Sequence, residues 1–456
     1  MVGNYLNLWF ELSERGPLNL IGDLWIKFHG VGQGLFSSID ACFHMCYSRA
    51  FPEGFAMVFD CGSKQRKNVA RKVRRYIQRR NSSHLDVLVI SHLHEDHVNG
   101  LPELLSYLDV DTVILPYLTP LERLLIAGIH PRRPAWYYGF LADPPSFFLS
   151  MGARRVLMLK EGERPPHDIL RPPERGPPKE PIYGPYSLDI GRLPEVNENV
   201  LDEFIRANPN ARSYLDKLVF LRRAEGPITV LCKHFPLIVL IPFVKEVEKR
   251  FLEEFKDCLK EKLRISDPPN TIEISRILRD RDERRKLKEC YHKISRPSQF
   301  NLTSLAMYLM LVYYRDIWAK CLYTGSLRYV PLMTLPPELI FEKIILKETS
   351  KYLGVMFTGD LPLRLPTVWK KFYNHYSILS SPGGVLQIPH HGSDSGCNID
   401  FFNSFKNSYG VISCGVGNKY GHPHPSTVQE AFRILKGLFI ADQKSSVEFL
   451  IRYLYR

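Results

Sequence analysis

Histidines concentrate in three short loops of this 456-residue chain. Seven of the fifteen histidines lie there: His92, His94 and His97; His390 and His391; His422 and His424. Imidazole nitrogens are common ligands of divalent transition metals, and carboxylates complete such sites. A lone histidine is more often a surface or core residue, but this degree of clustering predicts a metal centre.

The first of these loops is the most specific. Residues 91–97 read Ser-His-Leu-His-Glu-Asp-His and come directly after a predicted buried strand. In a loop that leaves a strand, His92 and His94 point the same way, so we expect them to share one ion. Asp96 and His97 lie beyond the turn and can reach a second ion.

A further carboxylate, Asp360, stands at the end of a separate predicted strand, in Thr358-Gly359-Asp360. One carboxylate can bridge two cations about 3.5–4 Å apart, and water held between such ions becomes hydroxide near neutral pH. We therefore predict that Asp360 bridges two ions and that the site hydrolyses its substrate.

The elements that must position these residues are short strands, each ending at one of the loops. We predict them over Phe55–Phe59, Leu85–Ile90, Leu353–Phe357, Val385–Ile388 and Gly410–Cys414. A helix follows the first strand, and its apolar face consists of Val69, Val73, Tyr76 and Ile77. This alternation indicates a layered α/β core with ligands gathered at strand ends.

Residues 91–97 resemble the signature of the metallo-β-lactamase superfamily, and the spacing of Asp60, this loop and Asp360 is similar to its first, second and fourth motifs. More narrowly, five short motifs look like those of the hydrolase domain of ComEC-type DNA-uptake proteins. They are Val31-Gly32-Gln33-Gly34, Asn301-x-x-Ser304, Thr358-Gly359-Asp360-Leu361, Pro389-His390-His391-Gly392-Ser393 and Asn418-x-Tyr420-Gly421-His422-Pro423. The resemblance covers residues 24–115 and 298–455. It implies an αβ/βα sandwich, an α/β fold, with a dinuclear site at one edge of the two sheets.

The resemblance implies a role for each residue of the site that matches one of the family's motifs. The metal ligands are His92 and His94 for the first ion, Asp96 and His97 for the second, and Asp360 for both. Asp60 lies behind the ligands and orients the histidine loop. The resemblance implies two divalent ions, with zinc preferred and manganese as the alternative.

The residues named so far do not complete the coordination shells of the two ions. The middle of the chain contains no recognisable histidine of the superfamily's third motif. One or more of three histidines must complete the shells, and we leave open which: His390, His391 or His422. With Asp60 and Asp96, His391 is also a candidate for the catalytic step.

The formal net charge is +13, and one segment supplies most of the excess. Between Gly62 and Leu85 there are nine Lys and Arg residues and no acid. A local basic stripe is typical of a surface that binds a polyanion, and nucleic acid is the usual one. The candidate contacts on the predicted helix are Lys67, Arg71, Arg74, Arg75 and Arg79. On charge alone, a solvated helix face explains the segment equally well.

The chain is predicted to have three parts: 20–120 and 298–456 form the two halves of the sandwich, and 121–297 is an insertion. The insertion contains a proline-rich stretch, Glu161–Pro185, which we expect to be irregular. The rest mixes strands and helices: two or three short strands are expected over Leu218–Val244, and charged helical segments over Val244–Ile265 and Ile272–Ile294. The insertion carries no recognisable chemical motif, and we expect it to hold substrate or a protein partner.

Nine cysteines are scattered without any Cys-x-x-Cys pair. This pattern favours reduced thiols and a cytoplasmic protein over a disulfide framework. No run of eighteen or more uncharged apolar residues occurs, so no membrane span is expected.

Together these features predict a dinuclear metal-dependent hydrolase, and specifically a nuclease or phosphodiesterase that acts on DNA or RNA. The ComEC resemblance and the basic helix both favour nucleic acid as the substrate. One alternative is a phosphodiesterase or esterase for small molecules, similar to the phosphorylcholine esterases. Another is a subunit that needs a partner protein, bound through residues 120–297.

Overall fold

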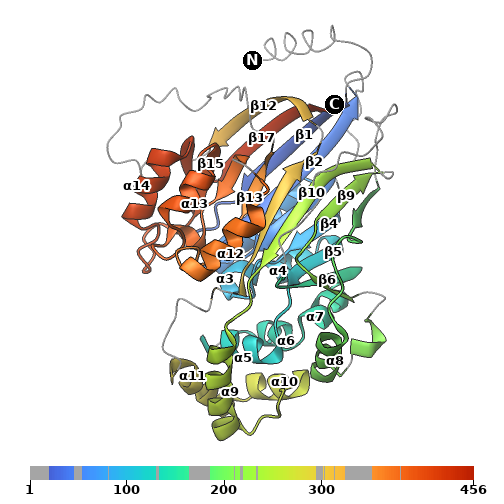
Figure 1. The fold of residues 1–456 in the computed structure, drawn as a ribbon, viewed down its shortest axis with the longest axis vertical. Helices are drawn as coiled ribbons and strands as arrows, with labels where there is room; N and C mark the ends of the chain where they lie inside the picture. Colours follow the sequence, from blue (N-terminus) through green and yellow to red (C-terminus); the bar gives the residue numbers. More distant parts are fainter. Residues whose placement is uncertain are drawn as a thin grey trace.

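The computed structural model describes residues 20–45, 54–80, 82–129, 133–163, 185–209, 211–215, 219–232, 235–293, 301, 303–312, 314–323, 352–379 and 382–455. In these parts of the chain, two β-sheets lie face to face, and helices cover their outer faces (Figure 1). A separate group of helices lies at one end of the sandwich, at the bottom of the view. The predicted α/β sandwich is confirmed.

The first sheet has nine strands among the described residues, in the order β12-β17-β1-β2-β3-β4-β5-β6-β8. Their bounds are β1 Leu20–Phe28, β2 Phe36–Met45, β3 Phe55–Cys61, β4 His84–Val89, β5 Asp109–Pro116, β6 Arg155–Lys160, β8 Val219–Arg223, β12 Tyr314–Tyr323 and β17 Val447–Tyr455. From β3 to β8 each strand is parallel to its neighbour, with Met57 opposite Val87. Parallel neighbours end at the same edge, so the loops after β3 and β4 lie close together.

The second sheet has eight strands in the described part of the chain, in the order β16-β15-β14-β13-β11-β10-β9-β7. Their bounds are β7 Tyr186–Asp189, β9 Ile228–Cys232, β10 Phe235–Val244, β11 Leu305–Leu311, β13 Leu353–Phe357, β14 Gly383–Gln387, β15 Ser408–Ser413 and β16 Gly437–Ala441. The strands β13 to β16 are parallel, so the loops after β13, β14 and β15 also share one edge.

Strand β11 shows why these segments read as continuous apolar runs. Its residues Leu305, Met307 and Leu309 belong to the buried layer between the two sheets. The alternate residues Tyr308 and Met310 belong to the layer between the second sheet and its helices. Because successive side chains point to opposite faces, a strand covered on both faces must be apolar at every position.

The helices outside the sheets are held by amphipathic spacing. In α2 (Arg66–Gln78) the residues Val69, Val73 and Tyr76 are buried against the first sheet, while most of the basic residues face solvent. The other helices next to the sheets are α3 Glu95–Val98, α4 Leu101–Leu105, α12 Pro366–Tyr376, α13 Ile399–Ser404 and α14 Pro425–Ile434.

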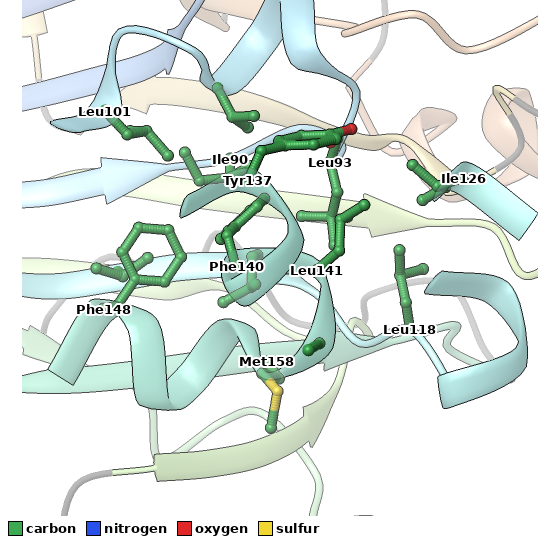
Figure 2. Close-up of a cluster of buried hydrophobic side chains, with 14 of the residues drawn as sticks. Ile90, Leu93, Leu101, Leu118, Ile126, Tyr137, Phe140, Leu141, Phe148 and Met158 are labelled. Atoms are coloured by element: carbon green, nitrogen blue, oxygen red, sulfur yellow. The ribbon is translucent and has the colours of Figure 1, made fainter. Parts of the chain in front are cut away.

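The helical group at the end of the sandwich has its own apolar core, continuous with that of the first sheet. Its helices are α5 Pro120–Ile129, α6 Ala135–Ala142, α7 Pro144–Ser150, α8 Glu198–Ala207, α9 Lys249–Leu263, α10 Thr271–Arg279 and α11 Arg281–Lys293. Figure 2 shows part of this core, where Phe140 and Leu141 of α6 and Phe148 of α7 gather near Ile90 and Leu93.

The span predicted as an insertion of mixed strands and helices contains both the helical group and strands of the two sheets. It contributes β6 and β8 to the first sheet and β7, β9 and β10 to the second. The helical segment predicted over Ile272–Ile294 is two helices, because Asp280 is extended and its carboxylate accepts a 2.8 Å hydrogen bond from the Glu283 amide. Residues 164–184 of the predicted proline-rich stretch lie outside the described residues.

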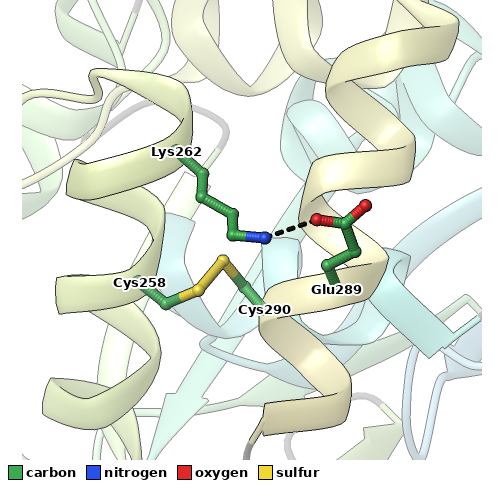
Figure 3. Close-up of a disulfide and its surroundings, with 4 residues drawn as sticks. All are labelled: Cys258, Lys262, Glu289 and Cys290. Atoms are coloured by element: carbon green, nitrogen blue, oxygen red, sulfur yellow. Dashed lines mark hydrogen bonds and ion pairs between the residues drawn. A yellow bond between two sulfur atoms is a disulfide. The ribbon is translucent and has the colours of Figure 1, made fainter.

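The expectation that the cysteines are all reduced is contradicted. Cys258 of α9 and Cys290 of α11 form a disulfide, beside an ion pair between Lys262 and Glu289 (Figure 3). The two cysteines are 32 residues apart in sequence, so only the packing of the two helices brings their Cα atoms to 5.6 Å. None of the helices in the described part of the chain has the length and apolar character needed to span a bilayer.

Candidate metal centre

The predicted histidine loops meet where the two sheets present the carboxyl ends of their parallel strands. The loops after β3, β4, β13, β14 and β15 all lie at this edge. Hydrogen bonds join the sheets there: the Leu305 amide donates to Ser91 O at 2.6 Å, and Ser413 Oγ donates to Gly34 O at 2.8 Å. Ligands of α/β proteins commonly bind outside the carboxyl ends of strands, so the position itself is that of a functional site.

Five buried ligand-type atoms at this edge have no hydrogen-bond partner among the described residues. They are the Nε2 atoms of His92, His94, His97 and His391 and Oδ1 of Asp360. A buried polar atom without a partner costs about 1–3 kcal/mol, so natural proteins rarely leave one unexplained. A divalent metal ion satisfies such lone pairs directly, and these donors therefore fit a metal centre.

Asp360 lies at the middle of this cluster. Its Oδ1 is 3.3 Å from His97 Nε2 and 3.7 Å from His391 Nε2. Its Oδ2 is 3.6 Å from His92 Nε2. The ligand atoms of Asp96, His97 and His391 also lie within 4.8 Å of one another. One carboxylate that faces three imidazoles has the position required of a residue shared by two ions.

Hydrogen bonds from the Nδ1 atoms of the histidines determine which ring nitrogen is available to a metal ion. His97 donates from Nδ1 to Asp60 Oδ2 at 2.7 Å, and His391 donates from Nδ1 to Ser413 O at 2.8 Å. Each ring therefore directs the lone pair of Nε2 into the centre. Ser91 donates from its amide to Asp60 Oδ1 at 2.6 Å, which ties the loop to the end of β3.

Several residues of the centre have unusual backbone conformations. Asp60, His390 and His391 have φ angles of 55°, 48° and 56°. Such left-handed conformations cost a non-glycine residue about 1–3 kcal/mol and persist where other contacts enforce them. Gly359 has a φ of 55°, and a Cβ atom there would lie 2.9 Å from the Cβ of Ser91. Glycine therefore lets Asp360 approach the histidine loop.

The histidines differ in the effect of their surroundings on protonation. Burial lowers the pKa of His94 to about 4 and holds that of His92 well below its usual range. Burial also opposes the charged form of His97, but the carboxylates of Asp360 and Asp60 outweigh it and raise the pKa to about 10. In the metal-free protein, a proton on His97 thus balances part of the carboxylate charge.

Both carboxylates of the centre stay ionised. Burial alone would raise the pKa of Asp96, but Lys64 and His97 hold it below its usual range. Lys64 Nζ lies 3.1 Å from Asp96 Oδ2. Burial alone would also raise the pKa of Asp360, but His391 and His97 outweigh this effect and hold the pKa well below its usual range. Metal binding requires ionised carboxylates and neutral imidazoles, so His97 must release its proton when an ion binds.

His390 and His422 lie at the border of the cluster. His390 Nε2 is 3.9 Å from Asp360 Oδ2 and 3.1 Å from Asn301 Nδ2. The ring of His422 is 5.3 Å from that of His390, and its Nδ1 lies 3.3 Å from Gln33 Nε2. Burial, followed by the neighbouring imidazole of His391, lowers the pKa of His422 to about 4. Neither ring is buried as deeply as those of His92 and His97.

Two residues close to the centre were not singled out for it from the sequence. Lys64 was counted only as part of the basic segment, although its position just after Asp60-Cys61-Gly62-Ser63 was a signal. Gln33 was seen only as part of a glycine-rich turn, and its side chain reaches the third histidine loop.

The structure divides the basic residues of the predicted helix into two kinds. Lys67, Arg71, Arg75 and Arg79 are exposed and pair with no carboxylate in the described part of the chain. Arg74 is also exposed but pairs with Glu103 at 2.6 Å. The other cations of the segment include Lys72 and Arg80, which are buried or half-buried and held by Ser446 and Asp40.

Residues 42–191 match the family model described as the metallo-beta-lactamase superfamily. Among solved structures, the metallo-beta-lactamase fold protein YhfI from Bacillus subtilis aligns over 94% of this chain and 99% of its own length. The identity is 10% and the TM-score 0.30, so this similarity carries no further argument. No curated protein sequence matches the chain.

The family match covers residues 42–191, and the two-sheet sandwich is consistent with the fold of that superfamily. Members of this superfamily are mostly metal-dependent hydrolases that bind divalent ions, often zinc. The clustered histidines and aspartates described above are the candidate site for such ions.

Proposed function

We propose that the protein is a phosphodiesterase that cleaves DNA or RNA at this metal centre. The proposed ligands are His92, His94, Asp96, His97 and His391, with Asp360 between two ions. Two divalent ions, zinc or manganese, would neutralise the charge of the phosphate and lower the pKa of the attacking water. Asp60 acts through His97 and Ser91, whose positions it fixes.

The position of Lys64 is the observation that carries the nucleic-acid part of the proposal. Its ammonium contacts Asp96 within the centre, and α2 begins two residues further along the chain at Arg66. The centre and the basic helix are therefore continuous. A phosphate held at the ions would place the rest of its strand against α2.

The exposed face of α2 suits a phosphate backbone. Lys67, Arg71, Arg75 and Arg79 recur every four residues, and side chains at this spacing are neighbours on one helix face, about 5–6 Å apart. Contacts of this kind give affinity without sequence preference, and they release counterions. The proposal therefore predicts binding that weakens steeply as salt rises.

The first experiment tests the purified 456-residue chain, loaded with zinc or manganese, on single- and double-stranded DNA and RNA. Metal-dependent cleavage should disappear in Asp96→Ala. Changing Lys67, Arg71, Arg75 and Arg79 together to Glu should weaken nucleic-acid binding at least tenfold. The logarithm of the binding constant should also fall less steeply with the logarithm of the salt concentration. For duplex nucleic acid the slope should decrease by about 0.9 for each phosphate that the variant no longer neutralises. Metal content should stay that of the wild type.

A matched control reverses four exposed cations elsewhere. Arg285, Lys286, Lys288 and Lys293 lie on α11 in the helical group. Their change to Glu alters the net charge by the same amount, so it tests whether the position of the charge matters. Equal losses of binding in both variants would contradict the proposed role of α2.

A small phosphodiester is the second candidate substrate. The burial of the ligands favours it, because His92 and His97 are 0% exposed and Asp360 is 3% exposed. Metal-loaded protein that hydrolyses bis(4-nitrophenyl) phosphate but none of the four nucleic acids would support this alternative.

A further inference from the structure

Gln33 connects two loops that come from opposite sheets. It is 6% exposed and lies in the turn between β1 and β2. Its Oε1 accepts a hydrogen bond from the Gly415 amide at 3.3 Å, and its Nε2 lies 3.3 Å from His422 Nδ1. Because a backbone amide can only donate, the amide oxygen of Gln33 must face Gly415 and its NH2 group must face His422.

This orientation decides the tautomer of His422. An NH2 group only donates, so His422 Nδ1 must accept and carries a lone pair. The neutral ring then has its proton on Nε2. His391 has the opposite arrangement, because its Nδ1 donates to the Ser413 carbonyl and its Nε2 carries the lone pair.

The loop of His422 is held in place by Asn418. Asn418 Nδ2 donates to Gly415 O at 2.7 Å and also to His422 O. Asn418 Oδ1 accepts from the amides of Tyr420 at 3.0 Å and His422 at 3.1 Å. The ring orientation is therefore set by the loop and by Gln33 before any substrate arrives.

His422 is also separated from the clustered ligand atoms. Neither of its nitrogens lies within 4.0 Å of a carboxylate oxygen in the described part of the chain. It belongs to neither group of ligand atoms that lie within 4.8 Å of one another among those residues. Its ring nevertheless borders the centre, 5.3 Å from the ring of His390 and 6.3 Å from that of His391.

We propose that His422 is a hydrogen-bond donor to the substrate rather than a metal ligand. Its Nε2–H would bind a phosphoryl oxygen next to the ions, and Gln33 is the positioning residue that keeps the proton on Nε2. This inference rests on the proposed phosphodiesterase function. It gives a role to the Val31-Gly32-Gln33-Gly34 turn and to Asn418-x-Tyr420-Gly421-His422, and it removes His422 from the candidates that complete the coordination shells.

The first test measures metal binding, which does not depend on finding the substrate. His422→Ala should keep the wild-type number of ions per chain and the wild-type metal affinity in chelator competition. His391→Ala should lose metal in the same assay. Loss of an ion in His422→Ala would assign His422 to a coordination shell and overturn the proposal.

The second test changes the tautomer. In Gln33→Glu a carboxylate oxygen can still accept from Gly415, but the other oxygen accepts from His422 and draws the proton to Nδ1. Two-bond ¹H–¹⁵N NMR spectra of histidine-labelled protein distinguish the two tautomers. We expect the Nε2–H form in the wild type and the Nδ1–H form in Gln33→Glu. An Nδ1–H signal for His422 in the wild type would contradict the inference.

The third test concerns anion binding and turnover by metal-loaded protein. Removing one donor to a reacting oxygen typically costs about 10²–10³ in kcat. We expect His422→Ala and Gln33→Glu to lose kcat in this range on the best phosphodiester found, and to bind inorganic phosphate at least tenfold more weakly. Unchanged phosphate affinity in both variants would sink the donor role.

The neighbouring His424 provides the matched control. It is exposed, precedes α14, and its Nδ1 lies 2.7 Å from Ser426 Oγ. His424→Ala should leave metal content, the His422 tautomer and phosphate binding unchanged. If the wild type cleaves no phosphodiester, the proposed function fails, and the metal and NMR measurements still decide whether His422 is a ligand.

Discussion

The metal centre and the helical group use buried polar side chains in opposite ways. At the centre, four imidazole nitrogens and one carboxylate oxygen converge without hydrogen-bond partners among the described residues, and three non-glycine residues have left-handed backbone conformations. In the helical group, Asn270 and Glu273 form a reciprocal cap at the start of α10, and a disulfide joins α9 to α11. The centre holds groups that cost stability until a ligand arrives, and such strain persists only where the rest of the fold compensates for it.

The largest effect that tests this comparison comes from Asp360→Asn. It removes the carboxylate that faces His92, His97 and His391. Loss of a side chain that only hydrogen-bonds to a metal ligand already lowers metal affinity or activity by about 10–100-fold. Loss of the proposed ligand Asp360 itself should therefore have a larger effect. Metal analysis and hydrolysis assays measure the change.

The same variant shows whether the converging ligand atoms are stabilised by metal. Ligands that bind only the folded state raise its stability, so metal should raise the melting temperature of the wild type relative to protein in EDTA. The rise should be much smaller in Asp360→Asn. An equal rise in both proteins would mean that the stabilising ion binds elsewhere.

The next effect concerns the disulfide of the helical group. The double change Cys258→Ala and Cys290→Ala should lower the free energy of unfolding by about 3–4 kcal/mol, because the loop that the disulfide closes is 32 residues long. Metal content should not change, since α9 and α11 contribute no residue to the centre. Reductant should destabilise the wild type and leave the double variant unaffected; a wild type insensitive to reductant would show that the bond does not form.

A buried histidine outside the centre sharpens the comparison. His375 lies in α12 beside Phe243, and burial lowers its pKa to about 4. The unfolded chain binds a proton at about pH 6.5, whereas the folded chain does not, so His375 makes stability fall as pH drops from about 6.5 to 4. In His375→Phe this acid-side loss should shrink by a few kcal/mol at most. Melting temperatures at pH 7.5 and pH 5, measured in EDTA, give the difference between the two proteins.

The smallest effect is expected at the start of α10. Asn270 accepts hydrogen bonds from the amides of Ile272 and Glu273, each at 3.0 Å. Asn270→Ala should cost about 1 kcal/mol of stability, and Asn270→Ser should restore most of it because serine also caps helices well. Urea denaturation measures both. Equal stability of the Ala and Ser variants would show that the cap contributes nothing measurable.

The sandwich could be predicted because its signals are local. Continuous apolar runs indicated β4, β13, β14 and β15, and helical spacing of Val69, Val73 and Tyr76 indicated α2. The histidine loops follow those strands, so their meeting at one edge was also predictable. The structure brings His92, His94, His97, His391 and Asp360 together, while their roles as ligands stay a prediction.

What the sequence did not predict depends on contacts between distant segments. Strand β10 pairs with β11 across the helices α9, α10 and α11, so the apolar run 235–244 indicated a strand but not its place in the second sheet. Lys64 follows Asp60 closely in sequence, but only the structure shows that its ammonium contacts Asp96. The disulfide was missed because its cysteines have no characteristic spacing.

The pairing of β1 with β17 has a consequence for biosynthesis. Leu24 of the first described strand lies opposite Ile451 of the last, so the edge of β1 that pairs with β17 has no partner until nearly all of the described chain has left the ribosome. Until then the nascent sheet has an unpaired edge, the kind of surface on which other chains aggregate and which chaperones protect. The histidine loop after β4 is translated early, but the β13, β14 and β15 loops that complete the centre come late. The order of synthesis therefore delays assembly of the candidate metal centre until nearly all of the described chain has been made.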